Sequence, residues 1–242
     1  MGLILVLIVG LVAGIFSGIV GTGASIMLVP VLATIYGPKA AVPIMAVAAV
    51  IANLSRILAW WRTVDWRAFA AYSITAGPAA FLGARTLLIL PARAVDFTIG
   101  LFLLSMIPLR HLLAKRMIRL TLWHMALAGA VIGFLTGIVV STGPISVPVF
   151  LGYGLVKGAF LATEGASSLV IYVVKVLTFG SSGALPLDLL LKGLITGAAI
   201  MAGTFIAKPF VLRLAPETFR VIMDGLMLIC GLTMIWNAVM AS

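Results

Sequence analysis

Two similar stretches of the chain place glycine, proline and hydroxyl residues inside strongly apolar surroundings. The first reads GIVGTGASIMLVPVL over residues 18–32, and the second reads GIVVSTGPISVPVF over residues 137–150. Glycine and proline interrupt helices, and the first turn of a helix exposes N–H groups that carry partial positive charge. Because such helix starts bind anions, the two stretches predict a pair of broken helices whose starts build one anion-binding site.

The polar residues of these stretches supply hydrogen-bond donors for such a site. Ser25 or Ser146 is suited to cap the half-helix that follows each break, and Asn53 lies on the helix after the first break. A small site rich in donors suits a compact oxyanion such as a sulfonate, sulfite or carboxylate. We therefore predict a substrate-binding set of Thr22, Gly23, Ser25, Pro30, Asn53, Ser141, Thr142, Gly143, Ser146 and Pro148.

Glycines can also serve packing alone, because a small-xxx-small pattern lets two membrane helices approach closely. Gly14 and Gly18 form one such pattern, and Gly133 and Gly137 form another. Packing does not account for the prolines that lie within a turn or two of each Thr-Gly pair. We therefore prefer broken helices for the two stretches, and packing remains an alternative for these four glycines.

Three of the charged residues within apolar segments are candidates for function, because charges there are costly and often functional. Glu164 lies near the start of such a segment and is the candidate for proton coupling. Its alternative role is an interfacial glutamate that is solvated or paired with Lys157. Arg56 and Lys175, 119 residues apart, each lie late in the helix that follows a break. They either line the path of the anion or extend their charged ends to the membrane interface.

The composition identifies the class of protein that carries these residues. The chain has 242 residues, of which 63% are hydrophobic and 9% are charged, whereas a soluble domain has about a quarter charged residues. Since one span needs about 20 apolar residues, roughly eight to ten crossings fit and no soluble domain is left over. The net charge of +10 comes from basic residues scattered among the loops, which orient membrane spans and do not indicate nucleic acid.

The two halves of the chain resemble one another. Besides the broken stretches, matching residues recur in the same order, among them Arg56 and Lys175. The most basic stretch of the chain, RHLLAKRMIR at 110–119, separates the halves. We predict one integral membrane domain in which a cytoplasmic linker joins two transmembrane repeats, 1–109 and 120–242.

The short segments after the breaks decide how the repeats are oriented. If the short segments do not cross the membrane, the repeats are parallel and 9 of the 16 basic residues lie in the cytoplasm. If the short segments do cross it, the repeats are inverted and 11 of the 16 basic residues lie in the cytoplasm. Cytoplasmic loops carry an excess of Lys and Arg, so inverted repeats are favoured. The expected fold is an all-α polytopic membrane protein with eight full spans plus two short segments, each repeat containing a broken or re-entrant helix.

In their longer context, the two stretches resemble a known family. GIFSGIVGTGASIMLVPVL at 14–32 is followed by PKAAVPIMAVAAVIANL, and GFLTGIVVSTGPISVPVF at 133–150 is followed by KGAFLATEGASSLVI. These motifs resemble the TauE/SafE family of sulfite-exporter-like permeases, also grouped with toluenesulfonate uptake permeases. The resemblance covers nearly the whole chain and implies multi-pass transport of an organosulfur compound or a sulfur oxyanion across the bacterial inner membrane. Family members carry a richer GxGGG run than GTGAS or STGPIS, so the substrate is left open.

Residues and resemblance together predict a secondary transporter for a small anion, with the bilayer as its second partner and Glu164 as the candidate proton carrier if transport is proton-coupled. A passive anion or small-solute channel is the alternative with the same architecture, and an intramembrane enzyme or scaffold subunit is the alternative from another class. The chain contains no H-E-x-x-H, G-x-S-x-G or Walker A motif, so we expect no catalytic residues, metal or cofactor. The direction of transport and the oligomeric state stay open, a homo-oligomer included.

Overall fold

Every described element of secondary structure in the computed structural model is helical. The described residues are 2–20, 24–91, 119–139 and 142–207, with isolated positions between 94 and 108 and between 228 and 239. The helices are α1 (Gly2–Val20), α2 (Ala24–Tyr36), α3 (Pro38–Trp60), the 3-10 turn η1 (Trp61–Thr63), α4 (Trp66–Ile89), α6 (Leu122–Ile138), α7 (Gly143–Gly152), α8 (Lys157–Ser181) and α9 (Leu187–Ala207).

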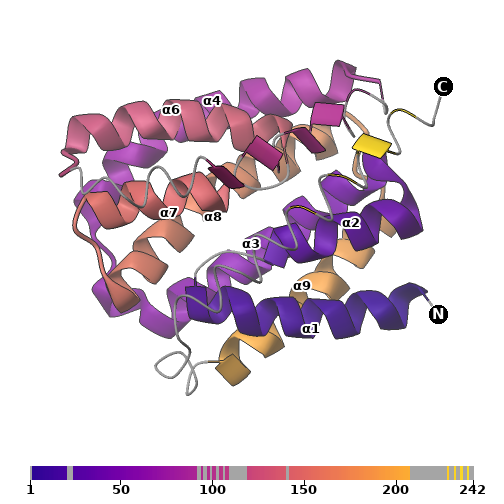
Figure 1. Cartoon of the computed structure of the whole chain (residues 1–242), viewed down its shortest axis with the longest axis horizontal. Helices are drawn as coiled ribbons and strands as arrows, with labels where there is room; N and C mark the ends of the chain where they lie inside the picture. Colours follow the sequence, from indigo (N-terminus) through magenta and orange to yellow (C-terminus); the bar gives the residue numbers. More distant parts are fainter. Residues whose placement is uncertain are drawn as a thin grey trace.

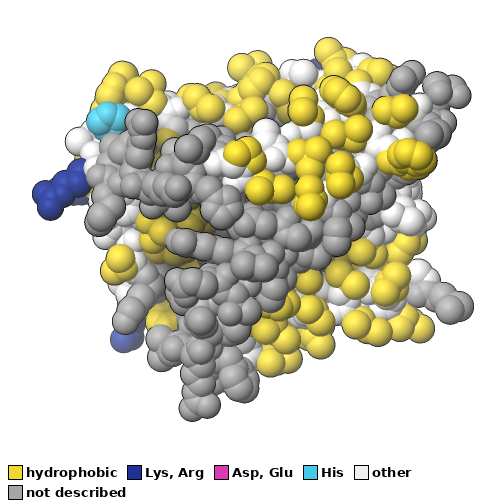
Figure 2. Space-filling view, viewed as in Figure 1, with side chains coloured by type: hydrophobic (Ala, Val, Ile, Leu, Met, Phe, Trp, Pro, Cys, Tyr) yellow, Lys and Arg dark blue, Asp and Glu magenta, His cyan; other side chains and the backbone are white. Residues whose placement is uncertain are grey.

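Three of the described helices have the length and the apolar composition that a membrane span requires. Large hydrophobic side chains stay exposed along the helices, such as Ile74 and Ile89. Among the described residues on the face in Figure 2, hydrophobic side chains predominate, and Lys and Arg are seen mainly at the left end. The prediction of an all-helical membrane protein is therefore confirmed. Helices long and apolar enough to span a membrane cover Lys39–Thr63, Gly158–Ser181 and Leu187–Ala207, and shorter apolar helices cover Gly2–Gly18, Met27–Tyr36 and Leu122–Ile138.

The helical path is interrupted between α6 and α7, where Val139 and Thr142 are not helical, and α1 and α2 lie on either side of residues 21–23, which are outside the described residues. The short helices that follow have 13 residues in α2 and 10 in α7. At 1.5 Å per residue they are about 20 Å and about 15 Å long, less than the hydrocarbon thickness of a bilayer. Pro30 lies within α2 and Pro148 within α7, where each residue lacks the backbone N–H that a helix uses.

Each short helix ends at a glycine whose backbone is left-handed. Gly37 follows α2 with a φ of 82°, and Gly154 follows α7 with a φ of 104°. The N–H of Gly37 bonds to the carbonyl of Ala33 at 2.9 Å, which closes the last turn of α2. A side chain would strain both positions. These turns return the chain so that α2 packs on α3 and α7 packs on α8.

Glycines bring α1 against α9 and α4 against α6, two pairs that lie along opposite sides of the molecule in Figure 1. A Cβ added to Gly14 would lie 2.1 Å from a carbonyl oxygen of α9, and one added to Gly133 would lie 2.5 Å from a carbonyl oxygen of α4. Gly18 and Gly137 also meet backbone of the neighbouring helix. All four glycines therefore have the packing role considered above, because no side chain fits at these distances.

The same contacts show that α1, α3 and α9 run in one direction. Ile200 and then Thr204 of α9 meet Gly14 and then Gly18 of α1, so the two helices are parallel. The contacts between α9 and α3 advance in the same order. They join Gly193 to Val47 and Gly197 to Ile51.

By contrast, α4, α6 and α8 run the opposite way. Helices α6 and α4 are parallel, because Gly129 of α6 meets Tyr72 of α4 and the later Gly137 meets the later Gly83. At the centre of the molecule α8 packs antiparallel on α3, and α4 packs parallel to α8. Since α1 and α3 are parallel, the chain must return between them through α2, and it must return through α7 between α6 and α8. The antiparallel contacts join Gly158 to Trp60 and Gly165 to Asn53.

Candidate functional site

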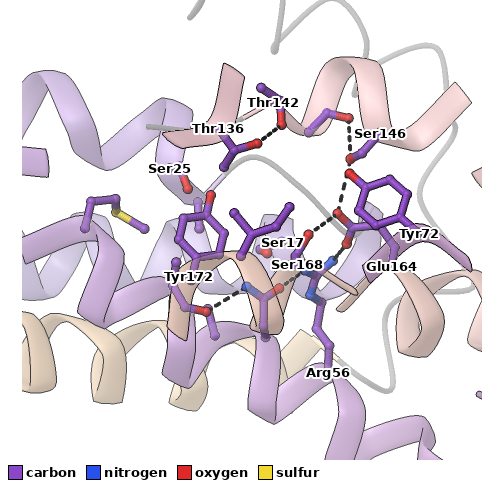
Figure 3. A pocket seen from close by; sticks show the side chains of 17 residues that line it. Ser17, Ser25, Arg56, Tyr72, Thr136, Thr142, Ser146, Glu164, Ser168 and Tyr172 are labelled. Carbon is purple, nitrogen blue, oxygen red and sulfur yellow. Dashed lines mark hydrogen bonds and ion pairs between the residues drawn. The ribbon is translucent and has the colours of Figure 1, made fainter. Parts of the chain in front are cut away.

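A pocket lies where the starts of α2 and α7 meet α3, α4 and α8 (Figure 3). Its volume is about 40 Å³, room for only a few water-sized groups. Both halves of the chain line it, and seven of the predicted residues do so. These are Ser25, Asn53, Arg56, Thr142, Gly143, Ser146 and Glu164.

The long helices α3 and α8 present matching faces to this pocket. A helix has 3.6 residues per turn, so positions spaced by 3 or 4 share a face. Every residue that α8 contributes lies 119 positions after a lining residue of α3. The pairs are Met45 with Glu164, Ala49 with Ser168, Ala52 with Ile171 and Asn53 with Tyr172.

An ion pair joins the two faces. Nη1 of Arg56 lies 2.6 Å from Oε2 of Glu164, and the exposed fractions of the two residues are 5% and 3%. Removing one member of such a buried pair leaves the other charge uncompensated, which is strongly destabilising. The structure therefore places Glu164 in the interior against Arg56, not at the interface with solvent.

The second carboxylate oxygen of Glu164 also has donors. Its Oε1 accepts hydrogen bonds from the Ser146 hydroxyl at 3.1 Å and from the Ser168 hydroxyl at 2.8 Å. These bonds tie the first turn of α7 to α8. The carboxylate is thus held by a guanidinium and two hydroxyls, and the same set of donors suits a small oxyanion.

Asn53 holds the guanidinium of Arg56 in place. Its Oδ1 accepts a hydrogen bond from Nη2 of Arg56, and its Nδ2 donates to the carbonyl of Ala49 at 2.8 Å. One side of the amide is therefore fixed to the α3 backbone while the other orients the cation. Asn53 lies one turn before Arg56, where a helix brings side chains together.

The start of α7 is built differently from the prediction. Thr142 precedes the helix, and its hydroxyl bonds to that of Thr136 across the break. The N–H groups of Ile145 and Ser146 bond to the Thr142 carbonyl at 2.9 Å and 3.0 Å. Ser146 lies inside the first turn and so cannot be the predicted cap; its hydroxyl reaches Glu164 and, at 3.2 Å, the carbonyl of Gly143.

Lys175 is buried but is not among the residues that line the pocket. Its ammonium donates to the carbonyls of Thr136 at 2.6 Å and Val139 at 2.8 Å, and it lies 5.8 Å from the ring centroid of Phe179. A cation at this position satisfies carbonyls that the end of α6 leaves unbonded and complements the helix dipole. The contacts of Lys175 therefore assign it to the end of α6.

The remaining predicted residues lie elsewhere or outside the described chain. Pro148 is half-buried in α7 without lining the pocket, and Pro30 lies in α2. Thr22, Gly23 and Ser141 lie outside the described residues.

Several residues that line the pocket were not predicted. Ser168 follows Glu164 by one turn, a spacing that signals a shared helix face, so the sequence did hold a clue to it. Tyr72 comes from α4 and lies beside Glu164 in Figure 3, and no motif surrounds it. Ser17 and Thr136 line the pocket from α1 and α6, and they occupy positions 119 residues apart.

Comparison with known proteins identifies the family. No curated protein and no solved structure matches the chain. The sequence profile of the family described as "Sulfite exporter TauE/SafE" matches residues 6–234, which include every described helix apart from the first turn of α1. The expected resemblance is confirmed, and the match places the chain among transporters of the membrane. On this evidence the protein belongs to the sulfite exporter TauE/SafE family.

Proposed function

We propose that this protein is a secondary transporter of the bacterial inner membrane that moves a small anion, with a sulfonate, sulfite or related sulfur oxyanion as substrate. The observation that carries the proposal is the pocket in which two helix starts converge with the buried guanidinium of Arg56. Paired helix interruptions at matching positions are where transporters bind their substrates. The described helices are also apolar outside, so the pocket lies where an anion would otherwise meet hydrocarbon.

The pocket suits an anion better than a cation. The starts of α2 and α7 direct the positive ends of their dipoles toward it, and Arg56 adds a full charge. Hydroxyl groups from both halves of the chain supply further donors. The small volume favours a compact head group such as a sulfonate or sulfite over a large organic anion.

Inverted repeats are the arrangement that we propose for the two halves. The antiparallel contacts put the end of α3 beside the start of α8, since Trp60 meets Gly158. The N–H of Leu120, just before α6, bonds to the carbonyl of Gly152 at the end of α7 at 2.9 Å. Both contacts fit a chain whose short segments return across the membrane, and neither fits eight spans with parallel repeats.

Uptake into proteoliposomes tests the proposal. Purified protein in liposomes should accumulate labelled sulfite or methanesulfonate above the external concentration when an ion gradient is imposed, and empty liposomes should not. The double variant Arg56→Gln with Glu164→Gln should lose uptake, because it removes the cation yet leaves no unpaired buried charge. Equilibration without accumulation would identify a passive channel, and the absence of uptake of any sulfur oxyanion would contradict the proposal.

A further inference from the structure

Glu164 is bound in the pocket as a substrate anion would be bound. Its two oxygens accept from Arg56 of α3, Ser146 of α7 and Ser168 of α8 at distances of 2.6 to 3.1 Å. Three helices therefore direct donors at one carboxylate. The side chain belongs to the protein, but the contacts are those of a bound oxyanion.

A substrate anion cannot simply be added beside this carboxylate. Arg56 and Glu164 are both almost fully enclosed. Two negative charges next to one guanidinium repel each other strongly where water is excluded. The anion and the ionised Glu164 are thus alternatives for the same donors.

We infer that Glu164 is an internal competitor for the substrate site, and that each anion binds to Arg56 together with one proton on Glu164. This inference rests on the proposed anion transport and adds its coupling. The described contacts give the competition a definite location, the Nη1 atom of Arg56, which Oε2 of Glu164 approaches to 2.6 Å.

The proton balance of the exchange is simple. A proton from water joins one carboxylate oxygen of Glu164, the pair with Arg56 separates, and a monoanion takes the freed guanidinium. The charge of the pocket is the same before and after, so the buried site never carries an unpaired charge. Release of the anion returns Arg56 to Glu164 and sets the proton free. A carrier that crosses between its two open states both with the Arg56–Glu164 pair formed and with the anion and proton bound is a proton–anion symporter.

Other titratable and polar groups face Glu164 from the helices that pack around it. From α4, Tyr72 faces the same pocket, and Tyr172 lines it from α8. Helix α3 contributes Arg56 and Asn53, and α7 contributes Ser146. The serine hydroxyl does not titrate near neutral pH. Lys175 lies on α8 with Glu164 but bonds to the end of α6.

The test measures methanesulfonate binding to the purified full-length protein as a function of pH. Methanesulfonate keeps a fixed single charge, so any pH dependence belongs to the protein. For the wild type, the apparent Kd should rise by about tenfold for each unit of pH increase over the range in which binding is linked to the uptake of one proton. In Glu164→Gln the affinity should be high and flat with pH.

Asp188→Asn is the matched control, because it also changes a carboxylate in an ion pair to an amide. Asp188 pairs with Lys192 at 2.7 Å on the exposed surface of α9, so this variant should behave as the wild type. Should Glu164→Gln fail to fold, the wild type still decides, because adding methanesulfonate in weak buffer should take up about one proton per anion bound.

The outcomes separate this inference from the proposed function. Binding whose pH slope is the same in the wild type and in Glu164→Gln, or binding without proton uptake, overturns the competition and leaves anion transport standing. If neither wild type nor Glu164→Gln binds methanesulfonate, sulfite or thiosulfate at any pH, both proposals fail.

Discussion

At the scale of single residues, the two buried cations at equivalent positions have different surroundings. Arg56 of α3 meets a carboxylate inside the pocket, whereas Lys175 of α8 meets two backbone carbonyls at the end of α6. The planar guanidinium can bond to Glu164 and Asn53 at once, while the compact ammonium fits between carbonyls. The pocket therefore has one cation available for an anion, and the other cation stabilises the fold.

Replacing Lys175 tests this division. Lys175→Met keeps most of the volume but leaves the carbonyls of Thr136 and Val139 without their donor. The loss should cost about 1.5–3 kcal/mol of stability, the range for hydrogen bonds to a charged group. A thermal unfolding scan should show a clear fall in Tm, and methanesulfonate binding by the folded protein should change little. A lower affinity with an unchanged Tm would return Lys175 to the anion path that the sequence suggested.

At the scale of helices, glycine serves two different purposes in the same stretch of chain. Gly133 lies in α6 where a Cβ would come within 2.5 Å of a carbonyl oxygen of α4. Ten residues later, Gly143 starts α7 and lines the pocket. The first glycine lets two helices pack closely, and we propose that the second gives a ligand access to the helix start.

Valine substitutions should separate these two purposes. Gly133→Val should destabilise the protein by at least about 1–3 kcal/mol, because an overpacked contact between rigid helices cannot relax. Gly143→Val should fold and insert but lose anion binding, since its side chain fills the pocket at the helix start. Expression, Tm and methanesulfonate Kd of the two variants are the measurements. Equal loss of stability in both would mean that Gly143 is also a packing residue.

At the scale of the whole molecule, the directions of the described helices support the proposed arrangement of two halves with opposite orientations. α1 and α3 run one way and their counterparts α6 and α8 run the other. Each half supplies a helix that packs on the other half, as α9 packs on α1 and α4 packs on α6. A transporter built this way can expose a central site to either side by exchanging the conformations of its halves.

Cysteine labelling in membranes tests the orientation. In a Cys230→Ser background, Arg62→Cys and Val156→Cys should be labelled from the same side of the membrane, and Lys39→Cys from the opposite side. Arg62, Val156 and Lys39 are exposed, so reagents can reach them. The excess of basic residues predicts that the shared side is the cytoplasm. Parallel repeats would instead put Arg62 and Val156 on opposite sides.

Some parts of this protein follow from the sequence alone, because they depend on composition and on neighbouring residues. The apolar composition determined the membrane class, and the Ser-Thr-Gly stretch located the interruption of the helical path between α6 and α7. The family motifs are local as well. Ser25, Thr142 and Gly143 could be placed at the site because they stand beside the breaks.

Other parts depended on the tertiary structure, because the partners are far apart in the chain. Glu164 and Arg56 are separated by 108 residues, so the sequence showed two charges without showing that they neutralise each other. Tyr72 joins the pocket only because α4 packs beside α8. Lys175 matched Arg56 in position, yet packing turned it toward the end of α6. The sequence alone gives the charge of each side chain, but the packing of the helices decides which groups that charge contacts.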